Sequence, residues 1–250
     1  MKKIIIGLVL ILCLCGCGKR VNENVKEPEK NIEIRNINED EKIILMKEID
    51  DLEYLDYYAK SFKVNELTNQ EVLQFIFHLY KDNVANDINF SSLEKYLGNY
   101  LDFPLEPENI LCNTHFNILG GSDYLYLYSI YDDTYSLNEN HNYHPKNGFG
   151  SDVFNKYVSG KVEGDKYIVR VNKAFSSILN ENRSYNESFY RSYNEASSKE
   201  NKLFDATYNG SYNKDILKEM EDFDDLYIYE YTFKKVNDKY LLVSYEINPK

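Results

Sequence analysis

The sequence predicts an α+β fold in which helices come first and an antiparallel sheet built from hairpins follows. Three observations support this prediction. Apolar residues recur at a spacing of three to four between residues 39 and 100, which is typical of amphipathic helices. Several later segments alternate in side-chain character and are joined by short turns that contain Gly, Asn or Asp. No segment alternates strand, helix and strand in the way that a parallel sheet requires.

The first two predicted helices are defined by their apolar faces. One spans 39–60, with apolar positions at Ile43, Ile44, Met46, Ile49, Leu52, Leu55 and Tyr58. The next begins at the capping box Thr68-Asn-Gln-Glu71, in which the Thr hydroxyl and the Glu carboxylate each bind a free backbone amide. Its apolar face consists of Val72, Phe75, Ile76, Leu79 and Tyr80.

Two shorter helices are also expected. A second capping box, Ser91-Ser-Leu-Glu94, predicts a helix that carries Leu93, Tyr96, Leu97 and Tyr100 and stops before Pro104. Within the long segment 176–225, a helix is expected from Asn213 to about Phe223, with Ile216, Leu217 and Met220 facing inward. The first half of that segment is expected to be irregular.

The predicted strands include two hairpins. The run 123–131 alternates Tyr with Leu, a period of two that indicates a strand. Strands 153–162 and 167–175 are joined by Glu163-Gly-Asp-Lys166, and strands 227–236 and 240–247 by Asn237-Asp-Lys239. Each pair therefore predicts an antiparallel hairpin.

This order of elements resembles the nuclear-transport-factor-like and cystatin-like superfamilies. In those folds, N-terminal helices pack into the concave side of a curved antiparallel sheet, so the resemblance implies a curved sheet here. The chain is also similar to Gram-positive lipoproteins that end in a hairpin such as YTFKKVNDKYLLVSYEI. The superfamilies include both enzymes and inert scaffolds, so they imply no function.

The first residues have the pattern of an export signal. Lys2 and Lys3 precede an apolar run from Ile4 to Leu14 that is too short to cross a bilayer. The stretch Leu14-Cys-Gly-Cys17 resembles the lipobox of bacterial lipoproteins, which implies that Cys17 receives a lipid and becomes the mature N-terminus. The alternatives are a cleaved secretory peptide and a short membrane anchor. We expect attachment to the outer face of the cytoplasmic membrane.

Composition divides the rest of the chain and excludes some partners. We expect a signal peptide over 1–16, a lipidated Cys and flexible tether over 17–38, and one globular domain over 39–250. The formal net charge is −12, and cleavage would remove Lys2 and Lys3 but no acidic residue. A chain with this negative charge would be repelled by nucleic acid and by an anionic bilayer surface, both of which bind positively charged proteins. Only Cys112 remains in the domain, so no intrachain disulfide is expected there.

Two short motifs point to a metal. Cys112-Asn-Thr-His115 and His141-Asn-Tyr-His144 each space two ligands by two residues, and a thiolate with imidazoles would suit zinc. The alternative is a buried cysteine near polar loop histidines. The zinc hypothesis requires all four side chains to meet.

Tyrosines are a second candidate site, since the chain has 24 Tyr and no Trp. Tyr124, Tyr126 and Tyr128 share one face of their predicted strand. An aromatic face can stack on sugars or peptides while its hydroxyls form hydrogen bonds. The alternative is that these residues border the core, because Tyr is a favoured strand residue.

The sequence contains no nucleophile elbow, zinc-protease motif or Walker loop, and we expect no cofactor. We therefore favour a non-enzymatic surface lipoprotein that binds a protein, a peptide or a cell-wall glycan. The alternatives are a hydrolase-like cavity enzyme on a cone fold and a zinc-binding extracellular domain.

Overall fold

The computed structural model describes residues 33–52, 55, 60–80, 88–111, 124–137, 153–177, 186–207, 212–223 and 226–248. The elements of the first half are β1 (Ile34–Asn36), α2 (Glu39–Asp51), β2 (Phe62–Lys63), η2 (Val64–Glu66), α3 (Asn69–Leu79), β3 (Ile88–Asn89), α4 (Phe90–Leu97), β4 (Ile110–Leu111), β5 (Tyr124–Ser129) and β6 (Thr134–Leu137). The second half contains β7 (Val153–Glu163), β8 (Lys166–Ser177), β9 (Asn186–Tyr190), α5 (Tyr193–Ser198), β10 (Phe204–Thr207), α6 (Tyr212–Glu219), η5 (Met220–Asp222), β11 (Ile228–Val236) and β12 (Lys239–Asn248).

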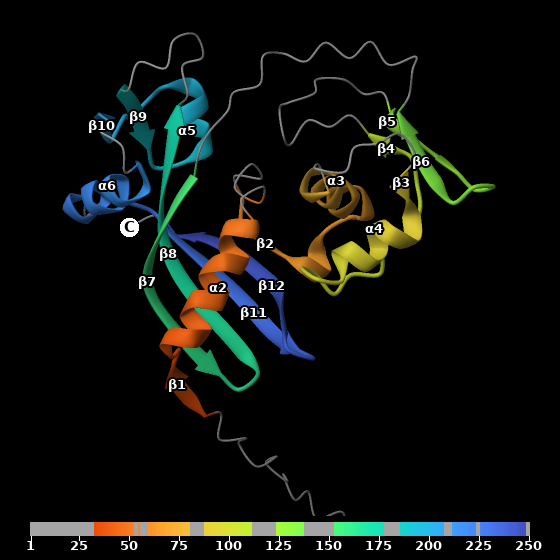
Figure 1. Cartoon of the computed structure of the whole chain (residues 1–250), viewed down its shortest axis with the longest axis horizontal. Coiled ribbons are helices and arrows are strands. Elements are labelled where there is room, and N and C mark those ends of the chain that lie inside the picture. The colour runs from red at the N-terminus through yellow and green to blue at the C-terminus, as the bar shows by residue number, and fades with distance from the viewer. Residues whose placement is uncertain are drawn as a thin grey trace, which may run out of the picture. The chain divides into compact units, whose positions relative to one another are not determined.

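The described strands form two antiparallel sheets (Figure 1). The larger sheet has the order β1-β7-β8-β11-β12-β2, and β9 and β10 extend it from β8. The smaller sheet has the order β3-β6-β5-β4. An α+β fold with a large antiparallel sheet is thus confirmed. The expected grouping of the helices at the N-terminus is not found, because strands β1 to β6 lie among the first helices, and α5 and α6 lie between β9 and β11.

Both predicted hairpins of the larger sheet are confirmed. Between β7 and β8, Gly164 has a φ of 65°, a left-handed conformation that favours glycine. Between β11 and β12, Asn237 and Asp238 have φ values of 48° and 65°. Two consecutive left-handed residues are typical of a type I′ turn, whose twist matches that of the flanking strands. Local turn chemistry therefore sets the register of both hairpins.

Helix α2 packs on the larger sheet through its apolar side. Leu45 and Ile49 are fully buried in one core cluster with Val169 and Val171 of β8 and Tyr231 of β11. Figure 1 shows α2 crossing these strands. The predicted helix over 39–60 is therefore present, and its regular part ends at Asp51.

One charged residue lies within this core. Lys173 of β8 is fully buried in line with Val169 and Val171, and its Nζ lies 5.5 Å from the ring centre of Tyr229 and 5.2 Å from that of Tyr231. Asn155 of β7, which pairs with Lys173, donates from Nδ2 to Oδ1 of Asp50 at 2.8 Å. The positive charge of Lys173 therefore has aromatic faces and a carboxylate nearby.

The carboxylate of Asp50 is only partly buried. Burial removes water from it and so raises the pKa of Asp50, although part of the residue is exposed. The hydrogen bond from Asn155 and the charge of Lys173 act in the opposite direction and lower it. This polar cluster joins the last turn of α2 to β7 and β8.

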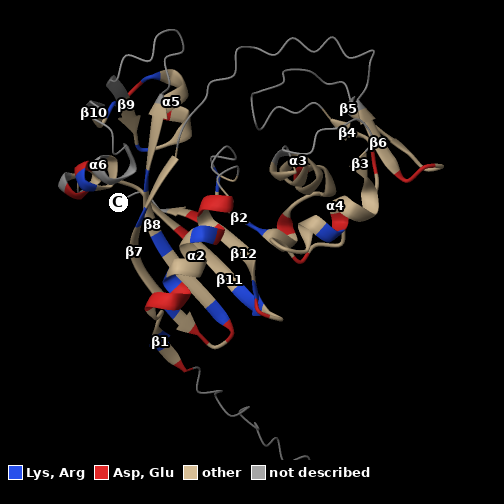
Figure 2. Ribbon diagram, viewed as in Figure 1, with Lys and Arg blue, Asp and Glu red and all other residues tan. Residues whose placement is uncertain are grey.

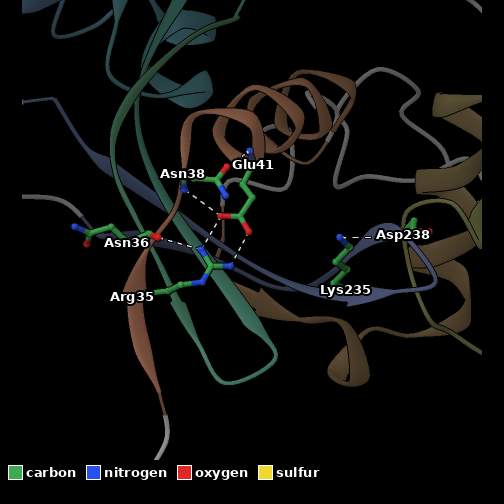
Figure 3. A network of polar contacts seen from close by, with 6 residues as sticks. All are labelled: Arg35, Asn36, Asn38, Glu41, Lys235 and Asp238. Atoms are coloured by element: carbon green, nitrogen blue, oxygen red, sulfur yellow. Dashed lines mark hydrogen bonds and ion pairs between the residues drawn. The ribbon is translucent and has the colours of Figure 1, made fainter.

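A second polar network fixes the start of α2 (Figure 3). Arg35 of β1 donates from Nη1 and Nη2 to the two carboxylate oxygens of Glu41 at 2.8 and 2.6 Å. The backbone N–H of Asn38 donates to Glu41, while that of Glu41 donates to Oδ1 of Asn38, which completes a capping box. β1 lies inside the range predicted as tether, yet it pairs with β7, and the folded unit begins at Glu33.

The smaller sheet is covered by α3 and α4. The predicted cap of α3 is confirmed, because Thr68 N–H donates to Glu71 at 2.8 Å and Glu71 N–H donates to Thr68 Oγ1 at 3.2 Å. The predicted cap of α4 is wrong. That helix begins at Phe90, and Oδ1 of Asn89 rather than Ser91 accepts from its first turn. Asn89 is already extended through pairing with Thr134, which is the backbone conformation an N-cap needs.

The segment 176–225 is more regular than expected. Its described part contains β9, α5 and β10, in addition to the expected helix α6. Phe189 of β9 and Phe204 of β10 stack at 4.7 Å between ring centres. A small second cluster of buried apolar residues, which includes Ile216 and Met220 of α6 and η5, forms around them. Packing between distant residues therefore gives regular structure to a segment whose composition predicts an irregular one.

Candidate functional site

The tyrosine-rich strand β5 has two different faces. Tyr126 packs on Phe77 of α3 at 4.7 Å between ring centres, and Tyr128 packs on Phe90 of α4 at 6.1 Å. Tyr135 of β6 pairs directly with Tyr128 and is buried between Phe77 and Phe90. The side chain of Tyr124 lies outside the described residues. The tyrosine face is thus the one that the helices cover.

Side-chain hydrogen bonds connect β5 to α3. Gln70 donates from Nε2 to the Asn109 carbonyl at 2.7 Å and accepts from the Leu111 N–H at 3.1 Å. Oδ1 of Asn109 in turn accepts from the Tyr128 N–H at 2.8 Å. β5 is therefore connected to a helix through side chains as well as through β4.

The turn between β5 and β6 is closed by its own polar side chains. The Tyr128 hydroxyl donates to Oδ1 of Asp133 at 2.7 Å, and the Ser129 hydroxyl donates to Oδ2 of Asp132 at 3.1 Å. The carbonyl of Asp133 accepts from the Phe90 N–H at 2.9 Å, which joins the turn to the start of α4. Asp133 has a φ of 54°, a left-handed conformation that Asp tolerates better than most residues. The hydrogen bond to Asp133 raises the pKa of Tyr128.

This closed turn exposes two large apolar side chains. Ile130 is 78% exposed and Tyr131 is 95% exposed. Leu127, on the face of β5 opposite the tyrosines, is exposed as well. We call Leu127, Ile130 and Tyr131 the hairpin patch. Single exposed apolar residues are common, whereas neighbouring ones that gather into a patch make a candidate contact surface.

The surroundings of the hairpin patch are acidic. Asp132 and Asp133 follow Tyr131 directly, and the turn between β5 and β6 is red in Figure 2. The two carboxylates are already used as acceptors within the turn. The hairpin patch is therefore an apolar surface bordered by negative charge.

Several predicted site residues lie outside the described part of the chain. These are Cys17, Cys112, His115, His141 and His144. Among the residues that the structure describes, no three His, Cys, Asp or Glu side chains are grouped so that they could hold a metal ion. The zinc hypothesis thus stays a prediction about residues whose positions are not described.

The sequence prediction missed Ile130 and Tyr131 as site residues, because it placed them inside the strand 123–131. The strand ends at Ser129. The signal was present in the pair Asp132-Asp133, since Asp is poor in strands and frequent in turns. A turn at Asp132-Asp133 would have placed the two preceding apolar residues at its tip.

Comparisons with family models, with curated proteins and with solved structures each find no match to this chain. In the part of the chain that the structure describes, no helix is both long enough and apolar enough to cross a bilayer.

Proposed function

We propose that this chain is a surface lipoprotein, anchored through Cys17, whose globular domain binds a protein partner through the hairpin patch. The observation that carries the binding role is the exposure of Tyr131 and Ile130 on a turn that hydrogen bonds already hold. Binding through a preorganised turn costs little conformational entropy. Tyr is also among the residues that contribute most to the centres of protein interfaces.

The hairpin patch favours a protein over a glycan. Tyr126 and Tyr128 of β5 are not open to a sugar, because they pack on Phe77 and Phe90. Tyr131 has an open ring, but a sugar site also needs several hydrogen-bonding groups around that ring, and the other two members of the patch are aliphatic. The patch itself combines aliphatic side chains with one phenol. A shallow apolar pocket on another protein would bury all three.

The anchor role is supported by residues at the start of the chain. Gly16 before Cys17 is small, as the lipobox requires, whereas Leu12 and Leu14 precede the other two early cysteines. As a tether, the polar stretch between Cys17 and Glu33 would span about 20 Å. That length would keep the domain close to the membrane while it searches for a partner.

We further propose that the larger sheet curves around α2, as in the cone folds that the order of elements resembles. The supporting observation is that Leu45 and Ile49 of α2 share one core with three adjacent strands, β7, β8 and β11. A sheet that bends toward a single helix can bury that helix from several strands at once.

The binding role is tested with a photo-crosslinking amino acid placed at position 131 of the full chain in its native cells. We expect a discrete, light-dependent adduct that disappears when Ile130→Ser is added. The matched control carries the crosslinker at Val158, an exposed position of β7, and should not give that adduct. An identical pattern at both positions, or no adduct at position 131, would show that the hairpin patch is not the binding surface.

The anchor is tested separately by growth with a radioactive fatty acid. The wild-type chain should be labelled and found in the membrane fraction, whereas Cys17→Ala should be unlabelled. Equal labelling of the two chains would overturn the anchor and leave the binding role to be judged by the crosslinking experiment alone.

A further inference from the structure

A second exposed apolar surface lies on α2, facing away from the sheet. Its members follow the spacing of one helix face, and Ile43 and Ile44 at its centre are 66% and 46% exposed. We call this surface the α2 stripe; it consists of Asp40, Ile43, Ile44, Lys47 and Asp51. The opposite side of the helix contains Leu45 and Ile49, which are fully buried. The helix therefore has one apolar contact with its own sheet and a second one with no counterpart among the described residues.

Neither the helix nor the core requires isoleucine at these two positions. Ile is a poorer helix former than Lys, Glu or Gln, which usually fill exposed helix positions. An apolar stripe on the solvent side of a helix is typical of a helix that packs on both sides. The two charged residues that flank the isoleucines, Asp40 and Lys47, form no ion pair with another described residue.

The order of residues in the α2 stripe is self-complementary. In a two-fold antiparallel pairing centred between Ile43 and Ile44, Ile43 of one copy meets Ile44 of the other. Asp40 lies three residues before Ile43, and Lys47 lies three residues after Ile44. The same symmetry therefore places Asp40 of each copy against Lys47 of the other. A two-fold interface needs this property, because the same surface must fit itself.

We propose that the α2 stripe is the contact surface for a second copy of this chain, with the two α2 helices antiparallel. Two ion pairs and a central group of four isoleucines would form the contact. The proposal does not depend on the lipid at Cys17, although anchoring would favour pairing by concentrating the copies in one plane. A single pair of helices is a small interface, so a dissociation constant on the order of 100 µM is expected for the chain in solution.

A bilayer is the main competing occupant of the α2 stripe, and charge disfavours it. Asp40 and Asp51 lie on the stripe itself, and Glu39 and Glu48 lie beside it. Burial, and to a smaller extent the nearby negative charge of Asp51, raise the pKa of Glu48. An anionic surface would repel these carboxylates, whereas a second copy supplies Lys47.

The test is sedimentation velocity of the purified full chain, in a non-ionic detergent, between about 5 and 200 µM. The wild type should shift from monomer to dimer over this range. Ile44→Asp should weaken dimerisation at least tenfold, and the matched control Val158→Asp, at an exposed apolar position of β7 outside both apolar surfaces, should not change it. Both substitutions are at exposed sites, so thermal unfolding should show that each variant is folded.

The antiparallel register is tested by reversing charges. Asp40→Lys and Lys47→Asp should each weaken the dimer about fivefold or more, and the double variant should restore wild-type association because it exchanges the two partners of each ion pair. A double variant no stronger than the single ones overturns the pairing. A wild type that stays monomeric overturns the proposal whether or not Cys17 carries a lipid, and binding to phosphatidylcholine vesicles that depends on Ile43 and Ile44 would assign the stripe to the membrane instead.

Discussion

Arg35 and Glu41 form a two-pronged ion pair that joins the first strand of the folded unit to its first helix. The two N–O distances are 2.8 and 2.6 Å, and the same carboxylate accepts from the Asn38 N–H, so Glu41 serves as counterion and helix cap at once. Ile37 follows β1 and donates from its N–H to the Gly160 carbonyl of β7. The pairing of β1 with β7 and this ion pair therefore both connect the first residues of the folded unit to the rest of it.

The cap at Asn38 predicts the first effect. Asn38→Ala should lower the free energy of unfolding by about 1 kcal/mol, because it removes the acceptor for the Glu41 N–H at the start of α2. Chemical denaturation with urea measures this change. The control is Asn36→Ala, an exposed position of β1, which should change the value by less than about 0.5 kcal/mol.

A pH dependence follows from Glu41. The hydrogen-bonded guanidinium of Arg35 lowers the pKa of Glu41 below its ordinary value. A carboxyl group whose pKa is lower in the folded state stabilises the fold above the unfolded pKa, about 4.3, and loses that contribution as pH falls through the folded value. Wild type should therefore be more stable than Glu41→Gln at pH 7, with the difference shrinking below about pH 4.3. A difference that stayed constant down to pH 2.5 would contradict the ion pair.

The close approach at Gly160 predicts a steric effect. A Cβ atom there would lie 2.5 Å from Cδ1 of Ile37 and 2.9 Å from the Tyr157 hydroxyl oxygen. Gly160→Ala should therefore force the side chains of Ile37 and Tyr157 to move and cost about 1 kcal/mol of unfolding free energy. Gly98→Ala is the control, since the nearest atom to its Cβ would be the Lys95 carbonyl oxygen at 3.6 Å, an ordinary contact. Equal stability of both variants would mean that Ile37 does not rest on Gly160.

The buried Lys173 predicts a large effect at a charged position. Lys173→Ala should cost about 3 kcal/mol, because it leaves a cavity beside Tyr229 and Tyr231 and removes the cation near Asp50. Arg170→Ala, on the opposite face of the same strand, should cost less than about 1 kcal/mol, although Arg170 pairs with Glu230. Urea denaturation of the two variants separates these outcomes. Similar losses would show that Lys173 is not enclosed as the structure describes.

Parts of the fold that depend on neighbouring residues in the chain were predictable. The capping box of Thr68 and Glu71 and the left-handed turns at Gly164 and at Asn237-Asp238 involve residues within three positions of one another. The short strands were not predictable, because β2 and β3 contain two residues each and exist only through pairing with β12 and β6. The same pairing moved the cap of α4 from Ser91 to Asn89.

At the candidate site, the sequence predicted the secondary structure but not which face of each element is covered. The alternation of Tyr and Leu in β5 predicts a strand but is equally regular on both faces, so it cannot say which face is covered. Phe77 and Phe90 decided that by packing on Tyr126 and Tyr128. In the same way, the period of α2 predicted a helix, while the exposure of Ile43 and Ile44 depends on which side meets the sheet.

The sequence by itself determined the class of fold, the two long hairpins and most helix positions, because propensity, capping and turn geometry act over a few residues. It also carries the lipobox resemblance at Cys17, which requires no fold. Only the tertiary structure decided that β1 belongs to the domain, that Lys173 lies in the core, and that Ile130, Tyr131, Ile43 and Ile44 face solvent. Burial depends on contacts between distant segments, and no local pattern encodes those contacts.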